Sequence, residues 1–299
     1  MLCQRIGWVF VAVLCAMTFH IVGSIEVTCY NNDDSKCVFE QDIMWDGMEE
    51  FVIKNSDEQA DSTTEIILQA PFKTKFIPTE IFRKFANLKS LTIMEVGLDT
   101  ISSDDFVNAK NLQYLHVRKN NIAVLKSSSF VAATNLLELD LSDNQITQIE
   151  EDAFNGLNEM TKLNLFANKV KDLNLAIFTK FPKLKYLVIA YADFIFSVPY
   201  DPEEAAKLVM LNSSVTILDL SNNYINSTDL WRHLSIFPNL ETVYLMSNKV
   251  THVDHMEEFK RLLPYLTEII MYTNPLDVDW KEGAKTFFDR LQIDFKYDF

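Results

Sequence analysis

The sequence predicts an α/β solenoid, in which short coils of chain stack so that their strands form one long parallel β-sheet. Two observations predict it. Phenylalanine recurs every 24 residues, at Phe82, Phe106, Phe130, Phe154 and Phe178. Leucine, isoleucine, valine or methionine repeats in the same phase within each of these units. Self-similarity at a period of roughly 20 to 50 residues indicates stacked repeats, each too small to bury its own core.

Each unit contains an alternating segment that predicts a strand. The best copy, LLELDLSDNQITQIEEDAFNGLNE at residues 136–159, separates Leu139 from Leu141 by one polar residue. Alternation with period 2 turns the leucines inward and the intervening residues outward. A strand of three or four residues is not stable alone, so we expect stacked copies to form a parallel sheet with one buried face.

Two further positions of the repeat predict structural roles. The phenylalanines lie on the return side of each coil, where we expect them to form a continuous aromatic core. An asparagine follows most of the strands, at Asn120, Asn144, Asn168, Asn223, Asn248 and Asn274. Because a side-chain amide both donates and accepts hydrogen bonds, these residues are expected to pair backbone groups at the turn and not to contact a ligand.

We expect about nine coils over residues 65–276, with an irregular first coil at 65–87. The unit that begins at Leu184 is lengthened by an insertion near residues 199–214. Its segment PEEAAKLVML predicts a short helix, with Pro202 at its start and two glutamates in the first turn. An insertion into one repeat is expected to protrude from one rim of the solenoid.

Both ends of the stack need covering, because an open solenoid end exposes core residues. Residues 25–64 are predicted to form an N-terminal cap that holds one local disulfide between Cys29 and Cys37, the two cysteines outside the N-terminal apolar segment. Residues 277–299 are predicted to form a C-terminal capping helix. Its apolar face consists of Trp280, Ala284, Phe287, Phe288 and Leu291.

The N-terminus is typical of a secretory signal peptide. Arg5 precedes an apolar run from Ile6 to Val22, and the small residues Gly23 and Ser24 follow. We expect cleavage after Ser24, which makes residues 1–24 a signal peptide and the mature chain extracellular. The alternative is a retained membrane anchor, for which an apolar run of this length is short.

These motifs resemble the leucine-rich-repeat superfamily across residues 65–276. The spacing Cys29-x7-Cys37, the segment FIPTEIFRKFANLKSL at 76–91 and the 24-residue coils look like those of secreted insect leucine-rich-repeat proteins, which include the short leucine-rich immune proteins of mosquitoes. The resemblance implies a horseshoe with a concave parallel sheet, and extracellular recognition in innate immunity or cell adhesion. The sequence lacks the cysteine cluster and heptad coiled coil that follow the repeats in the best-known members, so disulfide-linked pairing is not implied.

The sequence offers no catalytic constellation. It contains no glycine-rich phosphate loop, nucleophile elbow or metalloprotease helix, and no isolated pair of carboxylates for acid–base chemistry. His252 and His255 could be imagined as metal ligands, but their place after a strand predicts a solvated turn. We therefore expect a binding protein that is not an enzyme and has no cofactor or metal. The net charge of −15 argues against nucleic acid as a partner.

The outward strand residues are predicted to form the binding surface, because they share one wide and rigid face. They place a basic patch next to an acidic one, followed by an aromatic stretch of the kind that anchors protein interfaces. The alternative is that strands favour tyrosine through β-propensity alone. The predicted ligand-binding residues are Tyr114, His116, Arg118, Glu138, Asp140, Lys162, Phe166, Tyr186, Val188, Tyr191, Asp219, Tyr244, Met246 and Tyr272.

The sequence therefore predicts a secreted extracellular module that binds a protein ligand. Asn212 and Asn226 begin N-glycosylation sequons, which suit an exported chain. Two alternatives remain open at this point. One is a matrix scaffold that self-associates into a homo-oligomer, and the other is a membrane-anchored adhesion receptor that retains its N-terminal segment.

Overall fold

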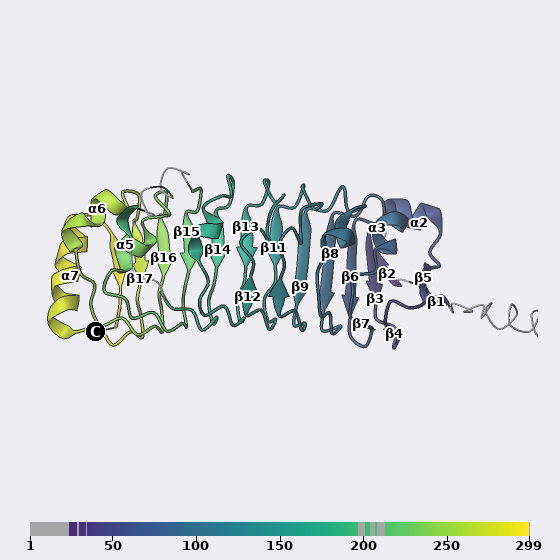
Figure 1. Cartoon of the computed structure of the whole chain (residues 1–299), viewed down its shortest axis with the longest axis horizontal. Coiled ribbons are helices and arrows are strands. Elements are labelled where there is room, and N and C mark those ends of the chain that lie inside the picture. The colour runs from purple at the N-terminus through teal and green to yellow at the C-terminus, as the bar shows by residue number, and fades with distance from the viewer. Residues whose placement is uncertain are drawn as a thin grey trace, which may run out of the picture.

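The computed structural model describes residues 24–28, 30–33, 35–196, 201–203, 207 and 213–298. Figure 1 shows these residues as a stack of coils along one long axis, with the N-terminal coils at one end and α7 (Val278–Arg290) at the other. The predicted signal peptide lies outside the described residues, as do most of the insertion near 199–214, Cys29 and Asn212.

A 12-stranded sheet runs through the whole stack. Its strands are β2 (Tyr30–Asp33), β3 (Lys36–Phe39), β6 (Glu65–Gln69), β8 (Ser90–Met94), β9 (Tyr114–Arg118), β11 (Glu138–Asp140), β13 (Lys162–Asn164), β14 (Tyr186–Val188), β15 (Ile217–Asp219), β16 (Thr242–Tyr244), β17 (Glu268–Ile270) and β18 (Asp294–Lys296). All neighbours pair in parallel except β2 and β3, which pair antiparallel. The predicted solenoid with its long parallel sheet is confirmed.

The return side of the coils holds short helices and two-stranded sheets. The helices are α2 (Asp57–Ser62), α3 (Glu80–Lys84), η1 (Ser103–Phe106), η2 (Leu175–Phe178), α5 (Leu230–Leu234), η3 (Met256–Glu258) and α6 (Phe259–Leu262). The small sheets pair β1 (Ser24–Val27) with β5 (Glu50–Ile53), β4 (Met44–Trp45) with β7 (Lys73–Thr74), and β10 (Val124–Leu125) with β12 (Gln148–Ile149). Such short elements depend on stacking for their stability.

The aromatic core follows the 24-residue period. Successive rings from Phe82 to Phe178 have centroids 6.2, 5.8, 5.9 and 6.0 Å apart, and all five side chains are buried. Aromatic pairs at this distance contribute roughly 0.5–1.5 kcal/mol beyond the burial of their area. The predicted spine is confirmed, and it holds each coil in register with the next.

The turn asparagines are satisfied by backbone groups, and all but the half-buried Asn274 are buried. In Asn144, the amide Nδ2 donates to the carbonyls of Val117 (2.7 Å) and Leu141 (2.9 Å), and Oδ1 accepts from the N–H of Ile122 (3.4 Å). Each asparagine therefore joins its own turn to the preceding coil. The predicted structural role is confirmed.

The N-terminal end begins earlier in the sheet than the sequence indicates. β3 lies inside the predicted cap of residues 25–64, yet it pairs in parallel with β6 as another coil would. Cys37 lies in β3, is buried and is disulfide-bonded. The pairing of Cys37 with Cys29, and the cap boundary itself, stay predictions.

The C-terminal end contains the predicted amphipathic helix, α7, with Ala284 and Phe288 buried. Phe288 packs against the ring of Trp231, with centroids 6.0 Å apart. The expectation of a helix alone over residues 277–299 is wrong, because the chain returns after α7 and adds β18 to the sheet. The segment Asp-Phe-Lys places one apolar residue inward, too little for periodicity to reveal a strand.

None of the helices in the described part of the chain combines the length and the apolar character needed to cross a bilayer.

Candidate functional site

The register of the sheet places the predicted ligand-binding residues on one surface, which we call the sheet face. It is the solvent side of the 12-stranded sheet and of the residues that directly follow each strand. One column across neighbouring strands contains Tyr114, Glu138, Lys162, Tyr186, Ile217 and Thr242. The next column contains His116, Asp140, Asn164, Val188, Asp219 and Tyr244. That these residues bind a ligand stays a prediction.

The first part of the sheet face, which we call the charged half, consists of Tyr114, His116, Arg118, Glu138, Asp140 and Lys162. Arg118 forms an ion pair with Asp140 at 2.8 Å, and Lys162 forms one with Glu138 at 2.9 Å. Both pairs join neighbouring coils. The predicted basic and acidic residues thus lie next to each other, and their charges neutralise each other across the strands.

Asp140 is not an exposed ligand-binding residue as predicted. Only 3% of it is exposed. Its Oδ1 accepts from the N–H of Ser142 at 2.9 Å, and its Oδ2 accepts from Nε of Arg118 at 2.8 Å. The carboxylate thus closes the strand end, where the turn leaves a backbone N–H without a ladder partner.

Two other residues in the column of Asp140 close their strand ends in the same way. Asp219 accepts from the N–H of Ser221 at 2.9 Å, and Asn164 accepts from the N–H of Phe166 at 2.9 Å. This role was missed in the sequence, although an aspartate or asparagine in the same phase of three coils is its signal. Asp219 remains half-buried, so part of it still faces solvent.

His116 is half-buried at the centre of the charged half. Its Nε2 makes no hydrogen bond and lies 3.5 Å from Oε1 of Glu138. Burial lowers the pKa of His116, and the positive charge of Arg118 lowers it further, while Glu138 and Asp140 oppose the shift. The imidazole is therefore neutral at neutral pH.

The second part of the sheet face, which we call the apolar half, consists of Phe166, Tyr186, Val188, Tyr191, Ile217, Tyr244, Met246 and Tyr272. Tyr186, Tyr191 and Tyr272 are 47%, 54% and 39% exposed. Their hydroxyl groups make no hydrogen bond to the described residues. The rings of Phe166 and Tyr191 lie edge to face, with centroids 5.1 Å apart.

One detail of the apolar half differs from the sequence-based prediction. Ile217 was missed, although it follows Tyr186 in its column and is half-buried. Ala190, which precedes Tyr191, is 3% exposed and adds almost no apolar surface. Tyr191 has a left-handed backbone with φ of 53°, as has the residue at the same turn in the neighbouring coils, for example Ala167.

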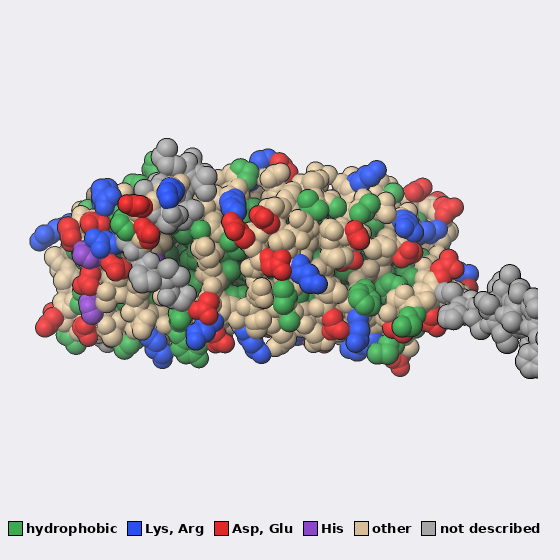
Figure 2. All heavy atoms as spheres, in the orientation of Figure 1, with side chains coloured by type: hydrophobic (Ala, Val, Ile, Leu, Met, Phe, Trp, Pro, Cys, Tyr) green, Lys and Arg blue, Asp and Glu red, His purple; other side chains and the backbone are tan. Residues whose placement is uncertain are grey.

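Acidic and basic side chains are not clustered by sign on the face that Figure 2 shows. Figure 2 shows acidic and basic side chains interspersed along the length of one face, with histidines among them at the C-terminal end. The net charge of −15 therefore does not produce one large acidic surface on this view.

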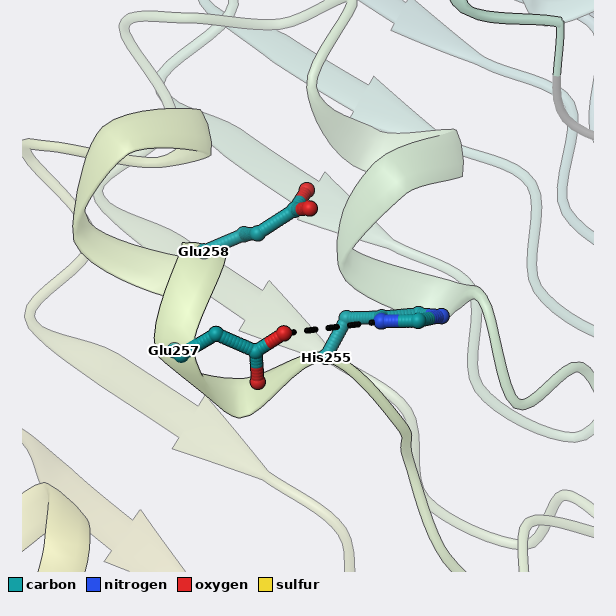
Figure 3. Close-up of side chains that lie close together, drawn as sticks. All are labelled: His255, Glu257 and Glu258. Atoms are coloured by element: carbon teal, nitrogen blue, oxygen red, sulfur yellow. Dashed lines mark ion pairs between the residues drawn. The ribbon is translucent and has the colours of Figure 1, made fainter.

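A group of acidic residues and one histidine lies at the C-terminal end of the return side. Figure 3 shows His255, Glu257 and Glu258 from neighbouring turns of one segment, with Nδ1 of His255 lying 3.6 Å from Oε1 of Glu257. Arg232 holds Glu258 at 2.8 Å and lowers the pKa of its carboxyl. Glu258 is therefore already neutralised by a guanidinium, and these residues do not argue for a metal site.

The other histidine of that turn faces different carboxylates. Nδ1 of His252 lies 3.4 Å from Asp277, whereas Nε2 of His255 lies 3.7 Å from Asp229. Both side chains are about 40% exposed. This arrangement agrees with the predicted solvated turn.

A cavity of about 370 Å³ lies on the return side, between β12 and the following coil. Polar and charged residues such as Gln148, Lys171 and Asp172 contribute much of its lining, and no histidine, serine or cysteine does.

Comparison with known proteins identifies the repeat. A family model described as leucine rich repeat matches residues 110–170. The protein is a leucine-rich-repeat solenoid. No curated protein sequence matches it.

Two solved structures share the leucine-rich-repeat fold. One is from the Toll–Spatzle complex, described as a molecular hub in Drosophila development and innate immunity, with a TM-score of 0.60 and 21% identity over 75% of this chain and 30% of that one. The other is from the complex of TLR13 with the single-stranded RNA ssRNA13, with a TM-score of 0.61 and 17% identity over 84% of this chain and 35% of that one. This solenoid thus spans 30–35% of the length of these chains, and the likeness shows the fold alone.

The second of these structures bears on the predicted partners. It contains a leucine-rich-repeat chain in complex with RNA, so the predicted exclusion of nucleic acid finds no support.

Proposed function

We propose that the protein is a secreted extracellular recognition module, without enzymatic activity, that binds a protein partner on the apolar half of its sheet face. The observation that carries the proposal is the exposure of Tyr186, Tyr191 and Tyr272 with free hydroxyl groups, next to half-buried apolar side chains. Tyrosine provides a large contact area and one polar group, which is why it is enriched in interface anchors.

The scaffold suits this role because it is rigid. The tyrosines project from strands and turns whose backbones are paired to both neighbouring coils, as Tyr186 is to Lys162 and Ile217. Binding therefore costs little ordering of the backbone, and more of the contact energy remains as affinity.

Several features support the extracellular setting. The N-terminal segment resembles a secretory signal, and Cys37 is disulfide-bonded, which is typical of oxidising compartments. The Toll chain, whose fold this solenoid shares, is described with innate immunity, and this supports recognition in immunity or adhesion. The sequence motifs favour a relationship to the short leucine-rich immune proteins of insects.

Site-specific crosslinking tests the proposed face. A photo-crosslinking residue replaces Tyr186 in one variant and Tyr265 in a control, since Tyr265 is 60% exposed but lies outside the sheet. We expect the first variant to capture a specific extracellular protein and the control to capture none. The captured protein is then purified, and its affinity is measured directly for the wild type, for the Tyr186→Ser, Tyr191→Ser double variant and for Tyr265→Ser.

Equal affinity for all three proteins would contradict the proposed face. Capture of a second copy of the chain, with dimers in sedimentation, would replace the proposal by the self-associating scaffold. Binding of a single-stranded RNA that is abolished by the same double variant would assign the face to nucleic acid. N-terminal sequencing of the chain from the medium is expected to begin at Ile25, and a retained N-terminus would favour the anchored receptor.

A further inference from the structure

The sequon Asn226-Ser227-Thr228 lies just after the turn that follows β15. Ile225 is fully buried, donates its N–H to Oδ1 of Asn248 at 3.0 Å, and accepts from the N–H of Lys249 at 2.8 Å. These bonds fix the segment between its own turn and the next coil.

Exposure alternates along this segment. Tyr224 is 54% exposed, Ile225 is buried and Asn226 is exposed. Tyr224 and Asn226 flank the buried Ile225, so the ring and the amide both lie on the solvent side of the segment, two residues apart. Among the described residues, neither side chain has a hydrogen-bond partner or a ring packed against it.

The described residues in the same phase as Asn226 are Ile195 in the preceding coil, which is half-buried, and Thr251 in the following coil, which is small and exposed. Neither of these two described positions carries an aromatic or charged side chain.

We propose that Asn226 carries an N-linked glycan whose first sugar packs on the ring of Tyr224. An oligosaccharide would be transferred from a lipid pyrophosphate donor. The bond between the anomeric carbon and the pyrophosphate oxygen breaks, a bond from that carbon to Nδ2 of Asn226 forms, and the amide proton leaves with the lipid pyrophosphate. The modification rests on the export that the proposed function includes.

The exposed ring gives the glycan a place to dock. One face of an N-acetylglucosamine ring presents C–H groups, and these pack favourably on the negative face of an aromatic ring while removing apolar area from water. The fixed backbone of Ile225 holds the two groups two residues apart on one side. Because the segment is not part of the 12-stranded sheet, the glycan is attached outside the sheet face.

The first test is chemical. The full chain is expressed in insect cells, and the peptide that contains Asn226 is analysed by mass spectrometry before and after enzymatic removal of N-glycans. We expect a glycan in the wild type, none in Thr228→Ala, and a glycan in the matched control Ser227→Ala, which keeps the sequon. An unmodified Asn226 in wild-type chain, recovered from medium or cells, would overturn the proposal.

The second test isolates the contact with the ring. Enzymatic deglycosylation should lower the melting temperature of the wild type by about 2–4 °C, the shift expected when one favourable contact is lost from a domain of this size. In Tyr224→Ser, which keeps the sequon, deglycosylation should cause a clearly smaller decrease. Equal decreases would refute the packing. Because none of these variants alters the sheet face, loss of partner binding there would count against the proposed function and leave this inference standing.

Discussion

The two halves of the sheet face have the same backbone and different side-chain chemistry. In the charged half, Arg118 pairs with Asp140 and Lys162 with Glu138, so its ionic groups are satisfied inside the molecule. In the apolar half, Tyr186 and Tyr191 are about half exposed and their hydroxyl groups have no partner in the described chain.

The difference shows that surface charge is a poor guide to a binding surface in a repeat protein. The register of the sheet brings charged side chains of adjacent coils within ion-pair distance. They therefore neutralise each other within the protein, without a partner. The exposed apolar area of the tyrosines on this face is removed from water only by contact with a group outside the sheet. This contrast is the reason for our proposal that recognition belongs to the apolar half and stabilisation to the charged half.

The largest expected effect is on partner binding. The Tyr186→Ser, Tyr191→Ser double variant should bind the captured partner about 100-fold more weakly, since removing interface anchors costs roughly 2–4 kcal/mol. A matched change in the charged half, Glu138→Gln with Lys162→Gln, should weaken binding less than about threefold if its charges serve the fold. Affinities from calorimetry provide the measurement. A larger loss in the charged-half variant would reverse our assignment.

The next effect concerns stability in the charged half. Asp140→Ala leaves the N–H of Ser142 without its acceptor in a buried turn, and should lower the free energy of unfolding by about 2 kcal/mol. The control Asp143→Asn removes an exposed carboxylate charge from the same turn, keeps a residue that tolerates the left-handed backbone there (φ 55°), and should change it by less than about 0.5 kcal/mol. Urea denaturation of both variants tests this contrast, and equal effects would show that Asp140 is not a strand-end cap.

A smaller effect is a dependence of stability on pH. Folding lowers the pKa of His116 below its ordinary value of 6.5. As the pH falls below 6.5, the imidazole therefore binds more protons in the unfolded chain than in the folded one. Stability from neutral His116 should therefore be present above pH 6.5 and be lost as the pH falls through the lowered pKa. Arg118, Glu138, Asp140 and Lys162 surround the imidazole. His116→Gln should reduce the pH dependence of the melting temperature between pH 7 and 5, whereas an unchanged profile would mean that the imidazole is not desolvated.

The smallest effect is expected for one exposed ion pair. Lys162→Gln removes the pair with Glu138, in which the lysine side chain is 43% exposed, and should lower the free energy of unfolding by less than about 1 kcal/mol. The difference from the wild type should shrink in high salt because the pair faces solvent. A loss comparable to that of Asp140→Ala would show that the charged half acts as one coupled network.

Much of the fold could be predicted because burial repeats with a fixed period. The positions of Phe130, Leu139 and Asn144 in the 24-residue unit predict an aromatic core, an inward strand residue and a turn bond, and the structure confirms all three. β18 could not be predicted, because the segment around Phe295 stands outside the period and becomes a strand through its pairing with β17.

The sequence predicted which strand positions form the candidate surface, but it predicted the exposure and pairing of their side chains less well. The phase correctly placed Tyr186 and Tyr191 outward, and it equally placed Asp140 outward. Asp140 is buried because Arg118, 22 residues earlier in the chain, lies beside it in the neighbouring coil and because its turn needs an acceptor. Alternation reports the side of the sheet, but it does not report which neighbours a side chain meets there.

By itself, the sequence of this protein determined the stack of coils, its apolar core and the set of side chains that face outward, because each follows from a local period in hydrophobicity. The tertiary structure alone decided which outward charges neutralise each other and how the chain ends in a further strand. Those outcomes depend on groups that lie more than twenty residues apart in the chain and meet through the register of adjacent coils, as Arg118 and Asp140 do.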